Sequence, residues 1–471
     1  MDLEKRSRRQ SRRVILSEVL MTITVIATVA ILALLVSGYW VNSDLTLERQ
    51  GMLQISSLPT GASVEVDGES SWLQRTNTSK VVTSGEHTVV LTKEGYDSWS
   101  KTVNVSEGLL YRLHYPRLFL LNRTKETVYD ATKYTFASVS PNRNLVLLTN
   151  DTTDWALLNL DADTITEKKV DVAKVFSAVS LAEGATSGLF TGTIKSINWA
   201  KDSEHILFEI SSETGREWVV LNVKNPAEKV NLTREFSSDF SEVKILNDSA
   251  SSLLAVRNGN LHRIDVSNRQ LSAVIVEKIY SFDHLDSEIV FSAEKTKKET
   301  EAEDSYHIGS LKLGENKITT LGSTASPVKP VISKFYDEEY ITVLSGNLAT
   351  LYEKQDFAEV FSKELSFSPE KLKVGHDGEF ITFYSGGMIA TLDMESTSIR
   401  EWNVPAEGFG WVDNDMIYGI SDGELRVYDF DGFNERALAS NASSHFPAAI
   451  VSDKWLYYFS DDSLVREVIR D

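Results

Sequence analysis

A pattern of four short strands recurs along most of this 471-residue chain, although its letters do not repeat. Each copy runs strand, polar turn, apolar strand, Gly or Asp turn, alternating strand, Asp or Asn turn, strand. The clearest copies lie at 136–164, 197–226, 244–271, 375–402 and 410–438. Short apolar or alternating runs bounded by turn residues predict the strands of antiparallel sheets. We therefore expect an all-β fold of repeated four-stranded units over the C-terminal part of the chain.

The second turn of each copy gives the length of the repeat. It falls near 150–154, and then near Gly215, Gly259, Thr300, Gly346, Gly387, Gly423 and Asp462. After the first interval these turns are about 36 to 46 residues apart, a spacing typical of β-propeller blades. Eight turns favour an eight-bladed β-propeller over residues 117–471, with seven blades as the alternative.

The two ends of this region predict how the ring closes. The last copy, 451–469, has room for three strands only, while 118–127 is a strand without neighbours ahead of the first copy. Because mixing the chain ends in one blade leaves no long open edge, we predict that 118–127 is the outer strand of the last blade. The stretches V-S-P-N at 139–142 and W-A-K-D-S at 199–203 resemble TolB-like and WD-repeat-like blades, although the WD dipeptide is lacking.

The N-terminus combines a basic tail with a long apolar stretch. Residues 3–13 carry six Lys and Arg against one Glu, and no charged residue lies between Val19 and Val36. About 20 apolar residues cross a bilayer as a helix, and positive flanks stay in the cytoplasm. The sequence thus predicts a cytoplasmic tail (1–13), an uncleaved transmembrane signal anchor (14–41), a spacer (42–50) and extracytoplasmic domains. Threonine hydroxyls in the anchor are expected to bond back to helix carbonyls.

Residues 51–115 alternate apolar and polar side chains between Gly and Pro turns, which predicts a small antiparallel β module. The order P-x-G-A-x-V-x-V-D-G, G-x-H-x-V, K-x-G-Y and V-x-V-x-x-G resembles the PEGA domain, a β-sandwich-like surface module of bacteria and archaea. The matching residues are Pro59, Gly61, Ala62, Val64, Val66, Asp67, Gly68, Gly85, His87, Val89, Lys93, Gly95, Tyr96, Val103, Val105 and Gly108. Thr60 replaces the signature Glu. The resemblance implies a surface-exposed, non-catalytic module of a bacterial membrane protein. Because a single histidine in a strand is more often a core residue than a ligand, His87 is expected to be packed and hydrogen-bonded.

Composition excludes several functions. The net charge is −20 despite the basic tail, which argues against nucleic acid, anionic lipid or anionic wall polymer as the main partner. Cysteine is absent, so disulfides, thiolate metal sites and Cys nucleophiles are excluded, and a bacterial ectodomain is favoured.

No motif predicts a catalytic, cofactor-binding or metal site. Residues 419–423 match G-x-S-x-G, but they lie in a strand-to-strand hairpin with too little chain after them for a hydrolase fold. The eight histidines have no metal-ligand spacing: His87, His114, His205, His262, His284, His307, His376 and His445. The Asp-rich turns do not fit a calcium loop and are explained by turn geometry.

Two segments interrupt the repeat, Val170–Ser196 and Glu294–Ser305. Strand direction places both on the membrane-distal face, where loops on a rigid ring commonly carry recognition. We therefore predict a membrane-anchored binding or scaffold protein that presents the β-propeller to a partner protein or an envelope glycan. The alternative is a propeller-type glycosidase or lyase with axial carboxylates. Three or more convergent acidic or His side chains in an axial pocket would favour the enzyme.

Overall fold

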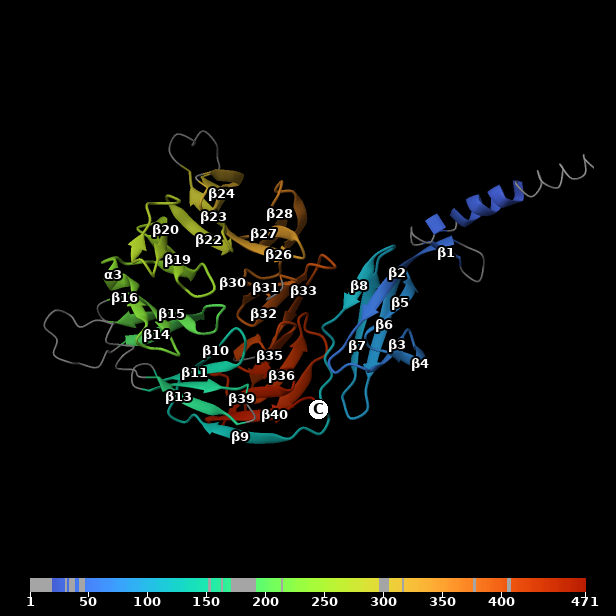
Figure 1. Cartoon of the computed structure of the whole chain (residues 1–471), viewed down its shortest axis with the longest axis horizontal. Helices are drawn as coiled ribbons and strands as arrows, with labels where there is room; N and C mark the ends of the chain where they lie inside the picture. The colour runs from blue at the N-terminus through green and yellow to red at the C-terminus, as the bar shows by residue number, and fades with distance from the viewer. Residues whose placement is uncertain are drawn as a thin grey trace, which may run out of the picture. The chain divides into compact units, whose positions relative to one another are not determined.

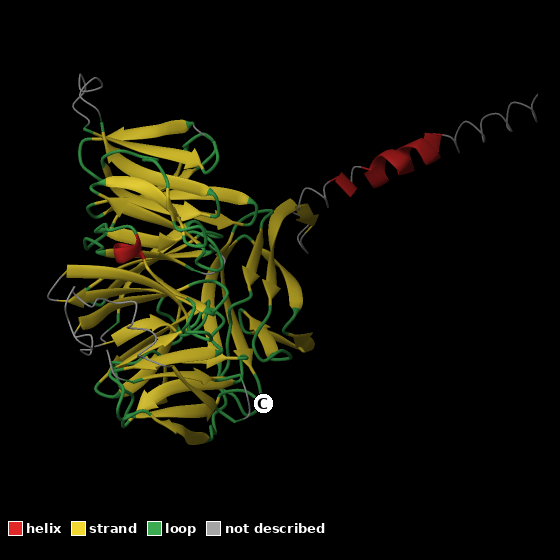
Figure 2. Cartoon of the chain, turned by 60° about the vertical axis from the view of Figure 1, so that its left-hand side comes forward, coloured by secondary structure: helices red, strands yellow, loops and turns green. Residues whose placement is uncertain are grey.

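The structure is a computed structural model that describes residues 19–29, 32–33, 39–41, 47–150, 154–161, 164–170, 192–212, 215–295, 305–315, 317–375, 378–404 and 408–471. It divides into two compact units, Met1–Leu121 and Asn122–Asp471. Strands make up most of the regular secondary structure described in both units, with loops and turns between them, as Figure 2 shows. The all-β prediction is therefore confirmed.

The described residues of the first unit form two four-stranded sheets. One contains β1 (Tyr39–Val41), β2 (Leu47–Ile55), β5 (Thr78–Thr83) and β8 (Leu110–Leu113). The other contains, in spatial order, β4 (Glu69–Arg75), β3 (Ser63–Val66), β6 (Gly85–Thr92) and β7 (Trp99–Val105). Strict alternation in β7 buries every second side chain, beginning with Trp99. Leu53, Val64, Leu91 and Trp99 are all at most 1% exposed and form the centre of this unit.

The start of the chain differs in part from the prediction. Residues 19–29 are helical, and the Thr24 and Thr28 hydroxyls donate to the carbonyls of Leu20 (2.9 Å) and Thr24 (2.8 Å), as expected. Among the residues that the structure describes, no helix is long and apolar enough to cross a membrane. The predicted anchor and spacer end too late, because Tyr39–Val41 pairs with Leu47–Arg49 as strands β1 and β2. Aromatic and β-branched residues favour this pairing.

The described residues of the second unit form eight four-stranded antiparallel sheets, numbered here 1 to 8 in chain order. Sheet 1 contains, in spatial order, β10 (Phe136–Val139), β11 (Leu145–Thr149), β12 (Trp155–Asn159) and β13 (Thr166–Val170), and sheet 2 contains β14 (Gly192–Trp199), β15 (His205–Ser212), β16 (Gly215–Asn222) and β17 (Lys229–Asn231). Sheet 3 contains β18 (Glu242–Ile245), β19 (Ser252–Arg257), β20 (Asn260–Asp265) and β21 (Gln270–Leu271), and sheet 4 contains β22 (Ile279–Leu285), β23 (Glu288–Glu294), β24 (Tyr306–Lys312) and β25 (Ile318–Thr324). A short helix, α3 (Leu232–Glu235), follows β17.

Sheets 5 to 8 repeat the same order. Sheet 5 contains β26 (Lys329–Phe335), β27 (Glu338–Ser345), β28 (Leu348–Glu353) and β29 (Glu359–Glu364), and sheet 6 contains β30 (Lys371–Val374), β31 (Phe380–Ser385), β32 (Met388–Asp393) and β33 (Ser398–Asn403). Sheet 7 contains β34 (Gly408–Trp411), β35 (Met416–Ser421), β36 (Glu424–Asp429) and β37 (Arg436–Ala439), and sheet 8 contains β38 (Ala449–Val451), β39 (Trp455–Ser460), β40 (Ser463–Val468) and β9 (Lys125–Asp130). The predicted number of eight repeats is confirmed by the number of sheets.

Each sheet packs against the next, and the last packs against the first. Hydrophobic clusters join sheets 1 and 2, 2 and 3, 3 and 4, 4 and 5, 5 and 6, 6 and 7, and 8 and 1. Sheets 7 and 8 are joined by a hydrogen bond from Ile450 N to Val412 O (2.9 Å). Because the contacts run in a closed circle, the second unit is β-propeller-like, and first strands such as β10 and β30 lie nearer its middle than β9 and β13 (Figure 1).

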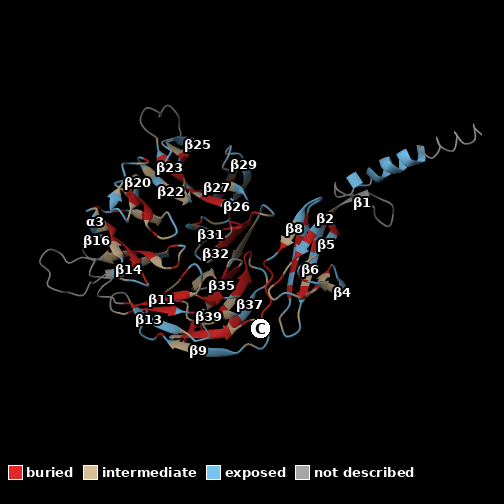
Figure 3. Ribbon diagram, in the orientation of Figure 1, coloured by how far each residue is buried: buried red, intermediate tan, exposed pale blue. Residues whose placement is uncertain are grey.

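The second and third strands of the sheets are apolar for a physical reason. In β15, Ile206, Phe208 and Ile210 face sheet 1, while Leu207 between them faces sheet 3. A strand covered on both faces has no polar side, so it reads as a continuous apolar run. The buried bands of Figure 3 follow these strands, whereas outer strands such as β13 and β29 are largely exposed.

The closing strand lies later in the sequence than predicted. It is β9, Lys125–Asp130, which pairs antiparallel with β40, rather than 118–127. Leu118 and Phe119 are 1% exposed and belong to the first unit, where Leu118 N donates to Leu58 O (2.8 Å). These two apolar side chains complete the core of that unit, so the outer strand of sheet 8 comes from the more polar residues after them.

Both predicted insertions are shorter than the ranges given above, because β14 already begins at Gly192 and β23 ends at Glu294. Residues 171–191 and 296–304, which hold most of these insertions, lie outside the described residues. The expectation that they lie on one face stays a prediction.

Candidate functional site

The G-x-S-x-G match is a hairpin, as predicted. Ser421 ends β35 and Glu424 begins β36, and the two residues between them, Asp422 and Gly423, have φ values of 52° and 74°. Two consecutive positive φ values are typical of the tight turn that joins neighbouring antiparallel strands. Ser421 therefore lies at a strand-to-strand hairpin rather than on the strand-to-helix elbow of a G-x-S-x-G hydrolase.

His87 is a packed, hydrogen-bonded residue, as predicted. Its ring is 7% exposed, with Nδ1 2.7 Å from Asp67 Oδ2 and Nε2 2.8 Å from Thr83 O. The Asp67 carboxylate also accepts from Thr88 N (2.9 Å), and the bond from His87 is the main reason that the pKa of Asp67 is lowered. Two motif residues, Asp67 and His87, thus pair with each other to fix a turn.

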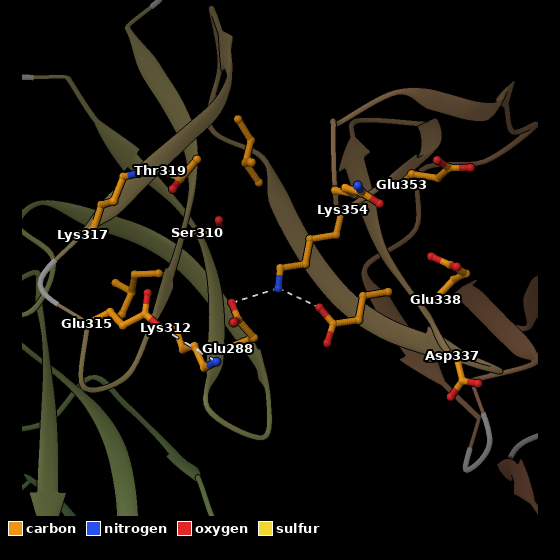
Figure 4. Close-up of a pocket in the computed structure, with 14 residues that line it drawn as sticks. Glu288, Ser310, Lys312, Glu315, Lys317, Thr319, Asp337, Glu338, Glu353 and Lys354 are labelled. Carbon is orange, nitrogen blue, oxygen red and sulfur yellow. Dashed lines mark hydrogen bonds and ion pairs between the residues drawn. The ribbon is translucent and has the colours of Figure 1, made fainter.

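A groove of about 590 Å³ lies between sheets 4 and 5, with charged residues on both walls (Figure 4). Lys354 crosses it, with its Nζ atom 2.9 Å from Glu288 of sheet 4 and 2.7 Å from Glu339 of sheet 5. Burial by itself would lower the pKa of Lys354, but the bonds to Glu339 and Glu288 outweigh burial and raise it. The Lys354 ammonium is ion-paired with both carboxylates, Glu288 and Glu339, and in this way it joins sheets 4 and 5.

We expect Lys354→Met to lower the free energy of unfolding by about 2 kcal/mol, because two partly buried carboxylates would lose their shared cation. Lys312→Met, at an exposed lysine of the same groove, should change it by no more than about 0.5 kcal/mol. Urea unfolding of both variants measures the difference. Equal stabilities would show that Lys354 does not join the sheets.

A second cavity, of about 750 Å³, lies where the first strands of four successive sheets converge. Its lining comes from β18, β22, β26 and β30 and includes Lys244, Asp283, His284 and Lys334. The carbonyl of Lys334 lies against Gly378, whose φ is 73°, and a Cβ on this glycine would overlap that carbonyl. The backbones of sheets 5 and 6 can therefore approach each other closely here. We call this space the axial cavity.

Lys244 is held in one position in the axial cavity. Its Nζ atom donates to Phe282 O (2.6 Å) and lies 3.4 Å from Asp283 Oδ1 and 3.5 Å from Glu242 Oε1. It also lies 4.7 Å from the centre of the Phe282 ring. Three oxygen acceptors and an aromatic ring fix this cation, and two of the acceptors are carboxylates, so an anionic ligand would meet an ordered ammonium that is shared with Asp283 and Glu242.

His284 and Ser333 present polar atoms that lack a partner within the described structure. The Nδ1 atom of His284 and the hydroxyl of Ser333 are buried without a hydrogen bond. Burial lowers the pKa of His284, and Lys244 acts in the same direction while Asp283 opposes it. A lowered pKa favours the neutral imidazole, and the cation in this part of the cavity is Lys244, which is paired with Asp283 and Glu242.

A third cavity, of about 430 Å³, lies between sheets 6 and 7. Two lysines of β30, Lys371 and Lys373, line one wall, and Phe409 and Trp411 of β34 line the other. We call it the Lys–aromatic cavity. Strand β30 thus lines both cavities, with Leu372 and Val374 in the axial cavity and the two lysines in the Lys–aromatic cavity.

Sequence reasoning named none of these lysines. The sequence feature that could have predicted the Lys–aromatic cavity is the alternation Lys371-Leu372-Lys373 in the first strand of a repeat, because it places two cations on one face of that strand. Of the eight histidines, His284 alone lines one of the three cavities among the described residues, and His376 lies outside those residues. Among the described residues, the axial lining holds two acidic or His side chains, Asp283 and His284, while His376 and Asp377, between the lining residues Gly375 and Gly378, lie outside that part of the chain.

Comparison with known proteins identifies the first unit more clearly than the second. Residues 50–116 match the family model of the PEGA domain. None of the curated proteins compared with the chain matches it. The PEGA resemblance seen in the sequence is thus confirmed for this segment.

Similar solved structures are distant. An oligogalacturonate lyase in complex with manganese is 14% identical, with a TM-score of 0.39, over 58% of this chain and 88% of that one. The oligogalacturonate lyase of Vibrio parahaemolyticus is 12% identical, with a TM-score of 0.40, over 74% and 97%. Dihydro-heme d1 dehydrogenase NirN is 12% identical, with a TM-score of 0.40, over 65% of each chain. Neither a ligand nor a reaction follows for this chain from similarity at this level.

Proposed function

We propose that this chain is a membrane-anchored extracytoplasmic binding protein whose propeller-like unit captures an anionic ligand at its first strands. The charge of the axial cavity and of the Lys–aromatic cavity supports this role. Among the described residues, four lysines, Lys244, Lys334, Lys371 and Lys373, and one carboxylate, Asp283, line them. Lys244 also pairs with Glu242 and Lys334 with Asp337, so Lys371 and Lys373 are the lysines of this lining that form no ion pair in the described part of the chain. The chain as a whole carries a net charge of −20, so this concentration of cations runs against its general composition.

A binding role fits this lining better than glycoside hydrolysis. Glycosidases need two carboxyl groups on either side of the scissile bond, one to donate a proton and one to act as base or nucleophile. Asp283 is the one carboxylate in the described lining of the two cavities, and both it and its neighbour Glu242 are ion-paired with Lys244. A lyase or glycosidase remains the competing function, and it predicts turnover of the ligand.

The basic tail and the apolar stretch of residues 14–38 support anchoring, with the PEGA-like unit and the propeller-like unit outside the membrane. The bound species would then be a component met at the cell surface, either a charged envelope glycan or an acidic segment of a partner protein. Recognition by the membrane-distal insertions stays a separate prediction.

Thermal unfolding of the full chain in a neutral detergent tests the proposal. We expect carboxylated oligosaccharides, an acidic peptide or citrate to raise the melting temperature, because a ligand of the folded state stabilises it by mass action. Neutral oligosaccharides of the same length should not. In Lys244→Met the shift at a fixed ligand concentration should fall by at least half, while Lys312→Met should keep it.

Shifts are compared with each variant's own ligand-free melting temperature, so that lower stability is not mistaken for weaker binding. Equal responses to charged and neutral compounds, or none to any of them, would contradict the proposal. Chemical conversion of a compound that binds would favour the enzyme.

A further inference from the structure

The Lys–aromatic cavity has two chemically different walls. On sheet 6, Lys371 lies opposite Tyr384 and Lys373 lies opposite Thr382 in the β30–β31 pairing, so these side chains share one face. Directly opposed residues of paired strands point to the same side of a sheet. On sheet 7, Phe409 and Trp411 are two residues apart in β34 and also share a face. The cavity is therefore cationic on one side and aromatic on the other.

Neither lysine of this cavity forms an ion pair within the described structure. Among those residues, neither ammonium has a carboxylate within ion-pairing distance, whereas Lys354, Lys363 and Lys244 all have one. Both side chains are exposed to the cavity, and Lys371 Nζ lies 6.0 Å from the centre of the Tyr384 ring. The surrounding protein lowers the pKa of Lys373, because desolvation disfavours its ammonium. A bound carboxylate would offset that cost.

Aromatic rings give the cavity a flat apolar surface. Tyr384, Phe409 and Trp411 are each half-buried, and the Tyr384 and Phe409 rings meet edge to face with centres 5.4 Å apart. Packing of Phe409 and Trp411 against the buried Ile389–Ile417 cluster holds these rings in place. The cavity volume of about 430 Å³ is in the range of small-molecule sites, which combine mostly apolar walls with a few placed polar groups.

We propose that the Lys–aromatic cavity is a subsite for an acidic saccharide, a pyranose that carries a carboxylate. Lys371 and Lys373 receive the carboxylate through charge-assisted hydrogen bonds, and the sugar ring lies against Phe409 and Trp411. Successive lysines on one face of a strand are about 6.6 Å apart at the backbone, so both ammoniums can reach the same ligand. This assignment rests on the proposed function and specifies its ligand.

Isothermal titration of the full chain in neutral detergent tests the subsite. The probe is a hyaluronan hexasaccharide, in which every second sugar carries a carboxylate, and its control is the same hexasaccharide after carboxyl reduction. We expect the acidic form to bind and the reduced form to bind at least tenfold more weakly. Lys371→Met and Lys373→Met should each weaken binding of the acidic form about tenfold, which corresponds to one charge-assisted contact of about 1.4 kcal/mol.

Three controls separate the possible outcomes. Lys317→Met removes an exposed lysine of the groove between sheets 4 and 5 and should bind like the unmodified chain. Phe409→Leu keeps both cations and should weaken the acidic hexasaccharide but not citrate, because a free anion needs no aromatic wall. Circular dichroism of each variant checks that it is folded.

If Lys371→Met and Lys373→Met bind the hexasaccharide normally while Lys244→Met does not, the subsite is wrong and the proposed function stands. If the chain binds citrate but no acidic saccharide, the ligand class is wrong. If it binds no anion at all, both proposals fail.

Discussion

Replacing Arg123 with alanine is expected to lower the free energy of unfolding of the propeller-like unit by about 3 kcal/mol. Arg123 Nε lies 2.6 Å from Glu467, and its Nη2 donates to Leu438 O (2.9 Å) on the neighbouring sheet 7. Glu467 is 5% exposed, and its other oxygen accepts from the Tyr458 hydroxyl (3.2 Å). Without Arg123 a buried carboxylate would lose its cation at the point where the ring closes.

Thermal unfolding followed by tryptophan fluorescence measures this effect. Lys125→Ala is the matched control, because Lys125 is an exposed cation of the closing strand β9. Adding Glu467→Gln to Arg123→Ala should recover part of the loss, since the unpaired charge is then removed. If Arg123→Ala melted like Lys125→Ala, ring closure would not depend on this ion pair.

Trp155→Ala is expected to cost about 4 kcal/mol, the second large effect on stability. Trp155 is 2% exposed in the cluster that joins sheets 1 and 2, and its ring meets that of Phe208 edge to face with centres 5.6 Å apart. Removing it leaves a cavity between two sheets that can close only if the ring deforms.

Tyr280→Ala provides the comparison for Trp155→Ala, because the Tyr280 side chain is 50% exposed. It should change the free energy of unfolding by no more than about 0.5 kcal/mol. Urea unfolding of the two variants measures the contrast. A loss below about 1 kcal/mol for Trp155→Ala would mean that sheets 1 and 2 can repack without this residue.

The strand order could be predicted from sequence because local chemistry fixes it. Pairs such as Asn258-Gly259 and Gly386-Gly387 have two positive φ values, which few residues other than Gly, Asn and Asp adopt, and they mark the second turn of a repeat. The apolar runs between such turns then give the strands that are covered on both faces. The number of repeats follows from these two signals.

Ring closure and the cavities could not be predicted in the same way. Leu118 and Phe119 look like the start of a strand, but their burial in the first unit moves the closing strand to Lys125–Asp130. Lys244, Asp283 and Lys334 lie roughly one repeat apart in the sequence, and only the register of each first strand decides whether they face one cavity. Register is a property of paired strands, which a single strand does not reveal.

The propeller-like unit is expected to bind an anionic ligand without converting it. The most direct test of this expectation is to incubate the full chain with a saturating concentration of the acidic hexasaccharide. The sugar is then recovered, and its mass is measured by mass spectrometry. We expect saturable binding in the isothermal titration and a hexasaccharide of unchanged mass. Shorter or unsaturated products, or the absence of binding, would contradict it.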